Sequence, residues 1–205
     1  MTSGTKQDKA PAGAAQNAKS HGIQGQDRKG QVALGAGPVD PLGAANWLGT
    51  LAILIQDRVE ARWQAELDLS PMSAAALVQV EQEAGCAIDL VATRIGLSHS
   101  ATVRLIDKLV ERDLVAKDRA RDDQRAQSLK LTKSGRKLAA QLHQIRNRVT
   151  DDLLGLVSPA EGQALGKAVA TILHRAVTTK REGDMVCRVC DEGRCRPEIC
   201  PIQEH

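Results

Sequence analysis

Four cysteines near the C-terminus have the spacing of a metal site. They follow the pattern Cys187-x2-Cys190-x4-Cys195-x4-Cys200, which places four thiols within 14 positions. Thiolates are soft ligands, and four of them in one short loop can close tetrahedrally around Zn²⁺ or hold a 4Fe–4S or 2Fe–2S iron–sulfur cluster. The spacing therefore predicts a metal site, with zinc favoured over iron–sulfur. The alternatives are redox-active thiols without a metal and a tail without function.

A second group of residues has the pattern of a DNA-reading helix. Residues 88–110 predict two helices joined by a sharp turn at Gly96-Leu97, the arrangement of a helix-turn-helix. The apolar positions of the second helix mark its buried side, so the opposite side near its N-terminal end is free to meet base edges. We expect Arg104 to contact guanine and Val103 to contact a thymine methyl group. The other expected contacts are Ser98, His99 and Ser100, near the phosphate-binding helix N-terminus, and Lys108.

A basic stretch follows this helix. Two extended pieces within Leu114–Thr132, separated by a polar turn at Asp118–Gln124, predict a hairpin. Residues 115–137 carry eight Lys or Arg and three Asp, a net charge of +5, against +3 for the whole chain. Such a concentration favours contact with phosphate or entry into a minor groove, and Arg121 belongs to the expected contacts. The alternative is a solvated basic surface over an ordinary helical hairpin.

Helices must position both groups. Apolar residues at steps of three and four predict a helix over 46–67, and Ser70-Pro71 is an N-cap followed by proline at the first helical position. Further helices are predicted over 71–83, 88–95, 98–112, 133–154 and 159–177. We therefore expect a mainly α fold with a small β-hairpin wing, a winged helix-turn-helix.

Composition divides the chain into three parts. Residues 1–45 are rich in Gly and Ala without any helical or strand period, which predicts a disordered N-terminal tail. Residues 46–177 hold the predicted winged-helix domain, with the helix-turn-helix and wing at 88–132. Residues 178–205 form a Cys-rich metal-binding or redox tail.

Composition also excludes several classes of protein. Two Trp and no Tyr or Phe exclude base stacking on aromatic side chains. The longest apolar run is far below the roughly 20 residues of a membrane span, and no apolar signal-peptide segment is visible, so we expect a cytoplasmic protein without membrane contact. No phosphate-binding Gly loop, paired carboxylates or His-based triad points to an enzyme. Isolated Cys86 is predicted to be a buried apolar residue, and both Trp are expected to pack within a dimer.

Two segments, LSPMSAAALVQVEQEAG and IDLVATRIGLSHSATVRLIDKLVERDLVAKDRARDDQRAQSLKLTKSGRKLA, resemble the MarR family of winged-helix transcription regulators. The resemblance as a whole spans roughly residues 46–177. The family's Asp-x-Arg element implies that Asp123 braces the wing and that Arg125 reaches the minor groove. Its Leu-Thr-x-x-Gly-Arg element matches Leu131–Arg136. The resemblance also implies an obligate homodimer, formed by the N- and C-terminal helices on a palindromic site in double-stranded DNA, and release by phenolic ligands or thiol oxidation. One departure is Val103, where the family commonly has a polar base-contacting residue.

The cysteine spacing in turn resembles a zinc knuckle, with Cys195 where that family has His. The glycine positions of the knuckle are replaced by Asp191 and Arg194, so nucleic-acid binding by a knuckle is not implied. We predict a sequence-specific transcription regulator, most simply a repressor, that is regulated through the four-cysteine site. The alternatives are a regulator released by a small organic ligand, with a purely structural zinc site, and a metal-dependent or thiol enzyme, which is the least favoured.

Overall fold

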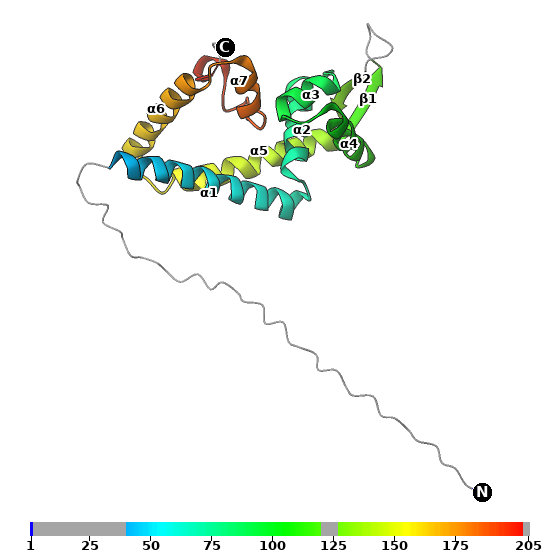
Figure 1. Cartoon of the computed structure of the whole chain (residues 1–205), viewed down its shortest axis with the longest axis horizontal. Helices are drawn as coiled ribbons and strands as arrows, with labels where there is room; N and C mark the ends of the chain where they lie inside the picture. The colour runs from blue at the N-terminus through cyan, green and yellow to red at the C-terminus, as the bar shows by residue number, and fades with distance from the viewer. Residues whose placement is uncertain (2–39, 120–126, 203–205) are drawn as a thin grey trace. The chain divides into compact units, whose positions relative to one another are not determined.

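Helices and one hairpin make up the part of the chain that the computed structural model describes, residue 1 and residues 40–119 and 127–202. This confirms the predicted mainly α fold with a two-stranded wing (Figure 1). None of the helices in these residues has the length and apolar character of a membrane span. In chain order the elements are α1 (Pro41–Leu67), α2 (Pro71–Gln82), α3 (Ile88–Ile95), α4 (His99–Glu111), β1 (Val115–Arg119), β2 (Gln127–Leu131), α5 (Lys133–Leu154), α6 (Pro159–Ala176), α7 (Lys180–Val186) and the 3-10 helix η1 (Pro197–Ile199).

Helix α1 begins earlier than the sequence predicted. The carboxylate of Asp40 accepts hydrogen bonds from the backbone N–H groups of Leu42 (3.2 Å) and Gly43 (3.3 Å), and Pro41 fills the first helical position. The predicted start at Asn46, and with it the end of the disordered tail at residue 45, was therefore wrong. The signal was present, because an N-cap followed by proline had correctly placed the start of α2.

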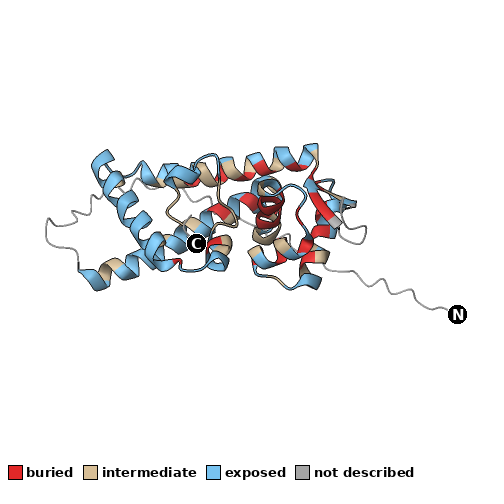
Figure 2. Ribbon diagram, turned by 90° about the horizontal axis from the view of Figure 1, so that it is seen from above, coloured by how far each residue is buried: buried red, intermediate tan, exposed pale blue. Residues whose placement is uncertain are grey.

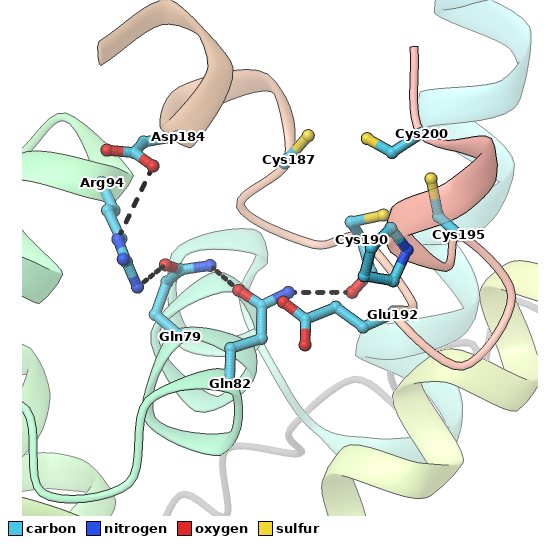
Figure 3. A pocket seen from close by; sticks show the side chains of 10 residues that line it. Gln79, Gln82, Arg94, Asp184, Cys187, Cys190, Glu192, Cys195 and Cys200 are labelled. Carbon is cyan, nitrogen blue, oxygen red and sulfur yellow. Dashed lines mark hydrogen bonds and ion pairs between the residues drawn. The ribbon is translucent and has the colours of Figure 1, made fainter. Parts of the chain in front are cut away.

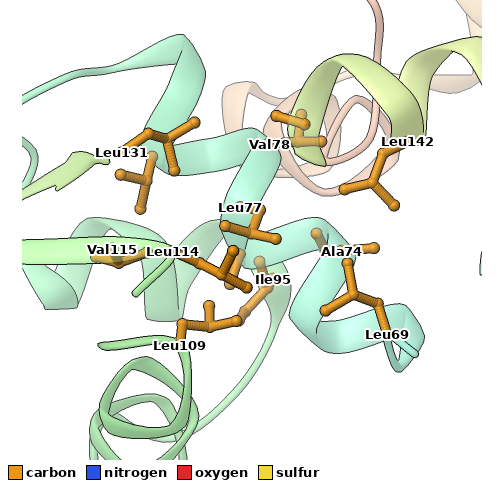
Figure 4. Packing of buried hydrophobic residues seen from close by; sticks show 14 of the residues in the cluster. Leu69, Ala74, Leu77, Val78, Ile95, Leu109, Leu114, Val115, Leu131 and Leu142 are labelled. Carbon is orange, nitrogen blue, oxygen red and sulfur yellow. The ribbon is translucent and has the colours of Figure 1, made fainter. Parts of the chain in front are cut away.

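Helix α2 lies at the centre of the core and is surrounded by neighbours. It contacts α1, α3, α4, α5 and β2. Its residues from Ala74 to Val80 are all buried, and fully buried Leu77 lies beside Leu114 and Ile95 (Figure 4). A helix that is covered on every side needs no polar face, which explains its nearly continuous apolar sequence.

The two tryptophans have different surroundings. Trp63 on α1 is 3% exposed, and its indole N–H donates to the carbonyl of Leu142 on α5 at 3.2 Å. Trp47 is 54% exposed. The expectation that both pack within a dimer was wrong for Trp63, which joins α1 to α5 inside the subunit core.

Backbone hydrogen bonds join the wing to the connection that leads into the helix-turn-helix. Strands β1 and β2 pair antiparallel, with Val115 opposite Leu131. The connection between α2 and α3 adds to this sheet, because Leu129 N–H donates to the Cys86 carbonyl (2.9 Å) and Gly85 N–H donates to the Leu129 carbonyl (2.7 Å). Gly85 has φ 94°, a conformation that favours glycine. Cys86 is 5% exposed, which confirms the prediction that it is a buried residue.

Two helical surfaces are apolar yet uncovered. Helix α6 has no buried residue, and the first half of α1 is almost entirely exposed (Figure 2). The exposed large apolar side chains on these two helices are Leu42, Trp47, Leu48, Ile53, Leu54, Leu165, Val169 and Ile172.

Helix α7 was not predicted. Thr179 accepts a hydrogen bond from the backbone N–H of Glu182 (3.3 Å), and the Glu182 carboxylate accepts one from the N–H of Thr179 (3.2 Å). This capping box starts a short helix that packs against α3. The Cys-rich segment is therefore connected to the helix-turn-helix by an ordered element.

Candidate nucleic-acid interface and thiol cluster

The recognition helix α4 is positioned by its cap and by its apolar side. Ser98 caps the helix by accepting a hydrogen bond from the N–H of Ala101 at 3.3 Å. Thr102, Ile106 and Leu109 are buried. On the other side the predicted contact residues His99, Ser100, Arg104 and Lys108 are exposed. The arrangement places these side chains where a winged helix meets a major groove.

The side chains on this surface differ in whether they already have a partner within the protein. The side chains of Arg104 and Lys108 make no hydrogen bond or ion pair within the described part of the chain, so both can reach an external anion. His99 is paired through Nδ1 with the carboxylate of Asp89 on α3 at 2.5 Å, a partner that sequence reasoning missed. Val103 is half-buried and packs against the core, so less of its side chain can meet a base than predicted.

The wing is described only at its base. Arg121, Asp123 and Arg125 lie outside the described residues, so their predicted contacts with DNA stay predictions. Part of the basic charge near them is compensated. Lys117 is paired with Asp107 on α4, and Lys130 is paired with Asp118 across the hairpin at 3.0 Å.

The Leu-Thr-x-x-Gly-Arg element joins the wing to α5. Thr132 caps α5 by accepting a hydrogen bond from Gly135 N–H at 2.9 Å, while its own N–H donates to the Leu114 carbonyl at 3.1 Å. A Cβ atom added to Gly135 would lie 1.9 Å from that same carbonyl oxygen. Glycine is required at this position because the backbone of Leu114, the residue before β1, lies directly against the first turn of α5.

The four tail cysteines surround one cavity. Cys187 follows α7, and the four thiols, all half-buried, line a space of about 300 Å³ together with side chains from α2, α3 and α7 (Figure 3). Backbone turns hold the loop, with Cys190 N–H donating to the Cys187 carbonyl (2.8 Å) and Cys195 N–H donating to the Asp191 carbonyl (2.8 Å). The structure therefore brings together all four residues that the sequence singled out.

The thiols affect each other's ionisation. A hydrogen bond from Cys190 lowers the pKa of Cys187 and raises that of Cys190 far above its usual range. Burial, and then the charges of Cys190 and Cys200, raise the pKa of Cys195 to about 12. Cys187 therefore ionises more readily than Cys190 and Cys195, and each further negative charge in the cluster is repelled unless a cation compensates it.

The donor set fits a soft metal ion, but the sulfur atoms do not form a finished cage. Among the described residues, no group of three or more His, Cys, Asp or Glu side chains has the arrangement of a metal site. Tetrahedral zinc bound by four cysteines needs Zn–S distances of about 2.3 Å at all four sulfur atoms. The predicted metal therefore stays a prediction.

The cysteine loop is docked on its own subunit. Arg194 makes two parallel hydrogen bonds to the carboxylate of Asp151 on α5, both 2.7 Å. Asn147, also on α5, donates to Asp191 at 2.7 Å. On α2, Gln82 donates to the Cys190 carbonyl at 3.1 Å. Sequence reasoning missed these contacts, and the capping box of α7 was the one local signal that could have revealed part of them.

Residues 67–126 match the MarR family model. That segment includes α2, α3, α4 and β1, and it ends before the cysteine loop. Among solved structures, the chain resembles RV1404 from Mycobacterium tuberculosis at 22% identity and TM-score 0.59, with 67% of this chain and 95% of that one covered.

Two further structures show the same likeness. YusO from Bacillus subtilis is 19% identical with TM-score 0.58, covering 66% of this chain and 97% of that one. A mutant of MepR from S. aureus, bound to an oligodeoxyribonucleotide, is 16% identical with TM-score 0.51, covering 65% of this chain and 97% of that one. The fold is therefore that of the MarR-type winged-helix proteins.

Proposed function

We propose that this protein is a MarR-family transcription regulator that binds double-stranded DNA. The observation that carries the proposal is the surface of α4, where exposed Arg104 and Lys108 have no partner in the described part of the chain while the opposite side is built into the core. The family match over residues 67–126 and the likeness to a MepR mutant with bound oligodeoxyribonucleotide support it. Arg121 and Arg125 belong to the proposed interface through the wing.

The active form is a homodimer on a palindromic site. Uncovered apolar side chains on α1 and α6, among them Trp47, Leu165 and Val169, form a surface that water solvates poorly. A second copy of the chain presents the same surface, and an interface with two-fold symmetry buries both at once. Two copies of α4 would then face half-sites about one DNA turn apart.

Selection of duplexes from a random pool tests both parts. We expect a palindromic sequence, bound with an affinity that falls steeply as salt rises. Arg104→Ala and Arg125→Ala should each cost about 1–3 kcal/mol of DNA-binding free energy. Lys167→Ala, which removes an exposed cation from α6, is the control. Loss of affinity equal to that of the control would refute the placement of these arginines at DNA.

Regulation acts through the four cysteines. Zinc fits them best, an iron–sulfur cluster is the alternative, and thiol oxidation without a metal is the third possibility. A bound cation would compensate the repulsion between thiolates and fix the loop. We would measure metal content and visible absorption of protein purified without oxygen. About one zinc per chain without colour supports the zinc site, iron with broad brown absorption supports a cluster, and absence of metal refutes both.

A further inference from the structure

We infer that Arg94 on α3 is the positioning residue through which the four-cysteine site acts on the DNA-binding unit. The inference rests on the proposed function and adds the connection between its two sites. Arg94 lies in the first helix of the helix-turn-helix, and its side chain lines the cysteine cavity (Figure 3). Among the described residues that line this cavity, it carries the one permanent positive charge.

A series of hydrogen bonds leads from Arg94 to a cysteine. Arg94 donates to Gln79 Oε1 (3.3 Å), Gln79 Nε2 donates to Gln82 Oε1 (2.7 Å), and Gln82 Nε2 donates to the carbonyl of Cys190 (3.1 Å). Gln79 also donates to the Arg188 carbonyl at 3.2 Å. Both carbonyls belong to the loop between the first two cysteines. A change in the shape of that loop therefore changes the acceptors of this series directly.

The series is largely shielded from water, because Gln79 is buried and Gln82 and Arg94 are half-buried. Gln79 is 2% exposed, and the Arg94 side chain is 16% exposed. A buried amide or guanidinium that loses its partner has no water to replace it, so breaking one link is costly and the neighbouring links adjust. Because each broken bond is costly, a displacement at one end of a short polar network moves the residues at its other end.

Arg94 is also incompletely satisfied. It forms an ion pair with Glu83 at 2.8 Å, but its Nε atom is buried without a hydrogen bond, and a carboxylate oxygen of Asp184 on α7 lies 3.9 Å from that atom. Asp184 lies three residues before Cys187. A movement of about 1 Å in α7 would bring these two atoms within hydrogen-bond distance, so a shift of α7 changes the contacts of Arg94 on α3 directly.

The charge of the metal–thiolate centre provides the driving force for a movement of Arg94. Four thiolates around Zn²⁺ carry a net charge of about −2, whereas protonated thiols carry none. A centre of that charge forming in a cavity whose lining has one cation attracts Arg94, and with it α3 and the turn to the recognition helix. Asp184 and Glu192, which line the same cavity, are also negative and repel the metal–thiolate centre. The stability of that centre therefore depends more strongly on the positive charge of Arg94.

A second cation supplies the matched control. Arg146 on α5 lies on the other side of the same thiols, in a cavity of about 400 Å³ that all four cysteines also line. Its positive charge lowers the pKa of Cys190, but it lies outside the helix-turn-helix. Removing either cation weakens metal binding, and removing Arg94 alone breaks the connection to α3.

The test compares DNA affinity with and without zinc. The full chain, reduced and metal-free, is titrated with the selected duplex before and after one equivalent of Zn²⁺. We expect zinc to change the dissociation constant for DNA by about 5–150-fold, the usual range of coupling between two sites. Arg94→Gln and Gln79→Leu should reduce that ratio to near one. Arg146→Gln should keep the wild-type ratio, although it needs more zinc.

The possible results distinguish failure of the inference from failure of the proposed function. A wild-type ratio in Arg94→Gln, or a ratio of one in wild-type protein that binds both zinc and DNA, overturns the inference. Wild-type protein that binds no DNA overturns the proposed function itself, whereas wild-type protein that binds DNA but no zinc overturns the inference and leaves DNA binding in place. Arg94→Lys, which keeps the charge but loses the hydrogen bond to Gln79, guards against misfolding and should give an intermediate ratio. Because coupling is reciprocal, DNA must change the zinc affinity of the wild type by the same factor.

Discussion

Replacement of Gly135 by alanine tests how the wing is fixed to α5. The added Cβ would lie 1.9 Å from the Leu114 oxygen and 2.9 Å from its carbonyl carbon, whereas such atoms essentially never approach within 3.0 Å. The backbone of Leu114 would have to move by about 1 Å to relieve this overlap. The same oxygen accepts the N–H of Thr132, which caps α5, so the displacement also weakens that cap.

These effects give the magnitude. Overpacking costs about 1–3 kcal/mol, a weakened cap adds up to about 1 kcal/mol, and the helix preference for alanine returns about 1 kcal/mol. We expect Gly135→Ala to lower the free energy of unfolding by about 2 kcal/mol, or the melting temperature by about 4–8 °C.

Circular dichroism during heating and urea unfolding measures the change. Gly166→Ala is the control, because its Cβ meets nothing within 4 Å, and the same substitution in the exposed part of α6 should raise stability by about 0.5–1 kcal/mol. If both variants were as stable as the wild type, the close contact between Gly135 and Leu114 could not be what holds the wing to α5.

Three further predictions concern single side chains. Burial, followed by the charge of Glu83, raises the pKa of Cys86 to about 11, so iodoacetamide at pH 8 should label Cys187, whose pKa is lowered, well before Cys86 in metal-free protein; equal rates by mass spectrometry would contradict this. Trp63→Phe removes a buried hydrogen bond between α1 and α5 and leaves a small cavity where the indole ring lay, so it should cost about 1–3 kcal/mol in urea unfolding, and a loss below about 0.5 kcal/mol would count against this packing. Hydrogen bonds from the backbone and hydroxyl groups of two preceding threonines lower the pKa of Glu182 below its ordinary value of 4.5, so its stabilisation of α7 is present above that value and lost as pH falls. Amide exchange protection of α7 should fall in acid, and protection independent of pH would exclude this role of Glu182.

Local signals predicted much of the fold. The bounds of α3 and α5 agree with the sequence interpretation because Gly96, in the left-handed conformation, and Thr132, as an N-cap, act on adjacent residues. The start of α1 and the whole of α7 were missed although capping signals stood at both. The burial of Trp63 could not be predicted, because its partner lies 79 residues away.

The candidate sites were predictable to different degrees. The exposed side of α4 follows from helical periodicity, and the convergence of four cysteines follows from their short separation in the chain. Partners were not predictable. The contact of Gln79 with the Arg188 carbonyl spans 109 positions and that of Arg194 with Asp151 spans 43, distances at which a single sequence holds no pairing signal.

The backbone bridge between Cys86 and Leu129 limits how any signal can change DNA recognition. With hydrogen bonds running in both directions, the base of the wing and the connection that enters the helix-turn-helix cannot separate without leaving backbone groups of buried Leu129 and Cys86 unpaired, so each subunit presents these two parts as one rigid lobe. In the proposed homodimer, the adjustable quantity is then the separation and angle of two such lobes. A signal should therefore alter how well the protein tolerates base pairs inserted between or removed from the half-sites, while base preference within each half-site stays the same.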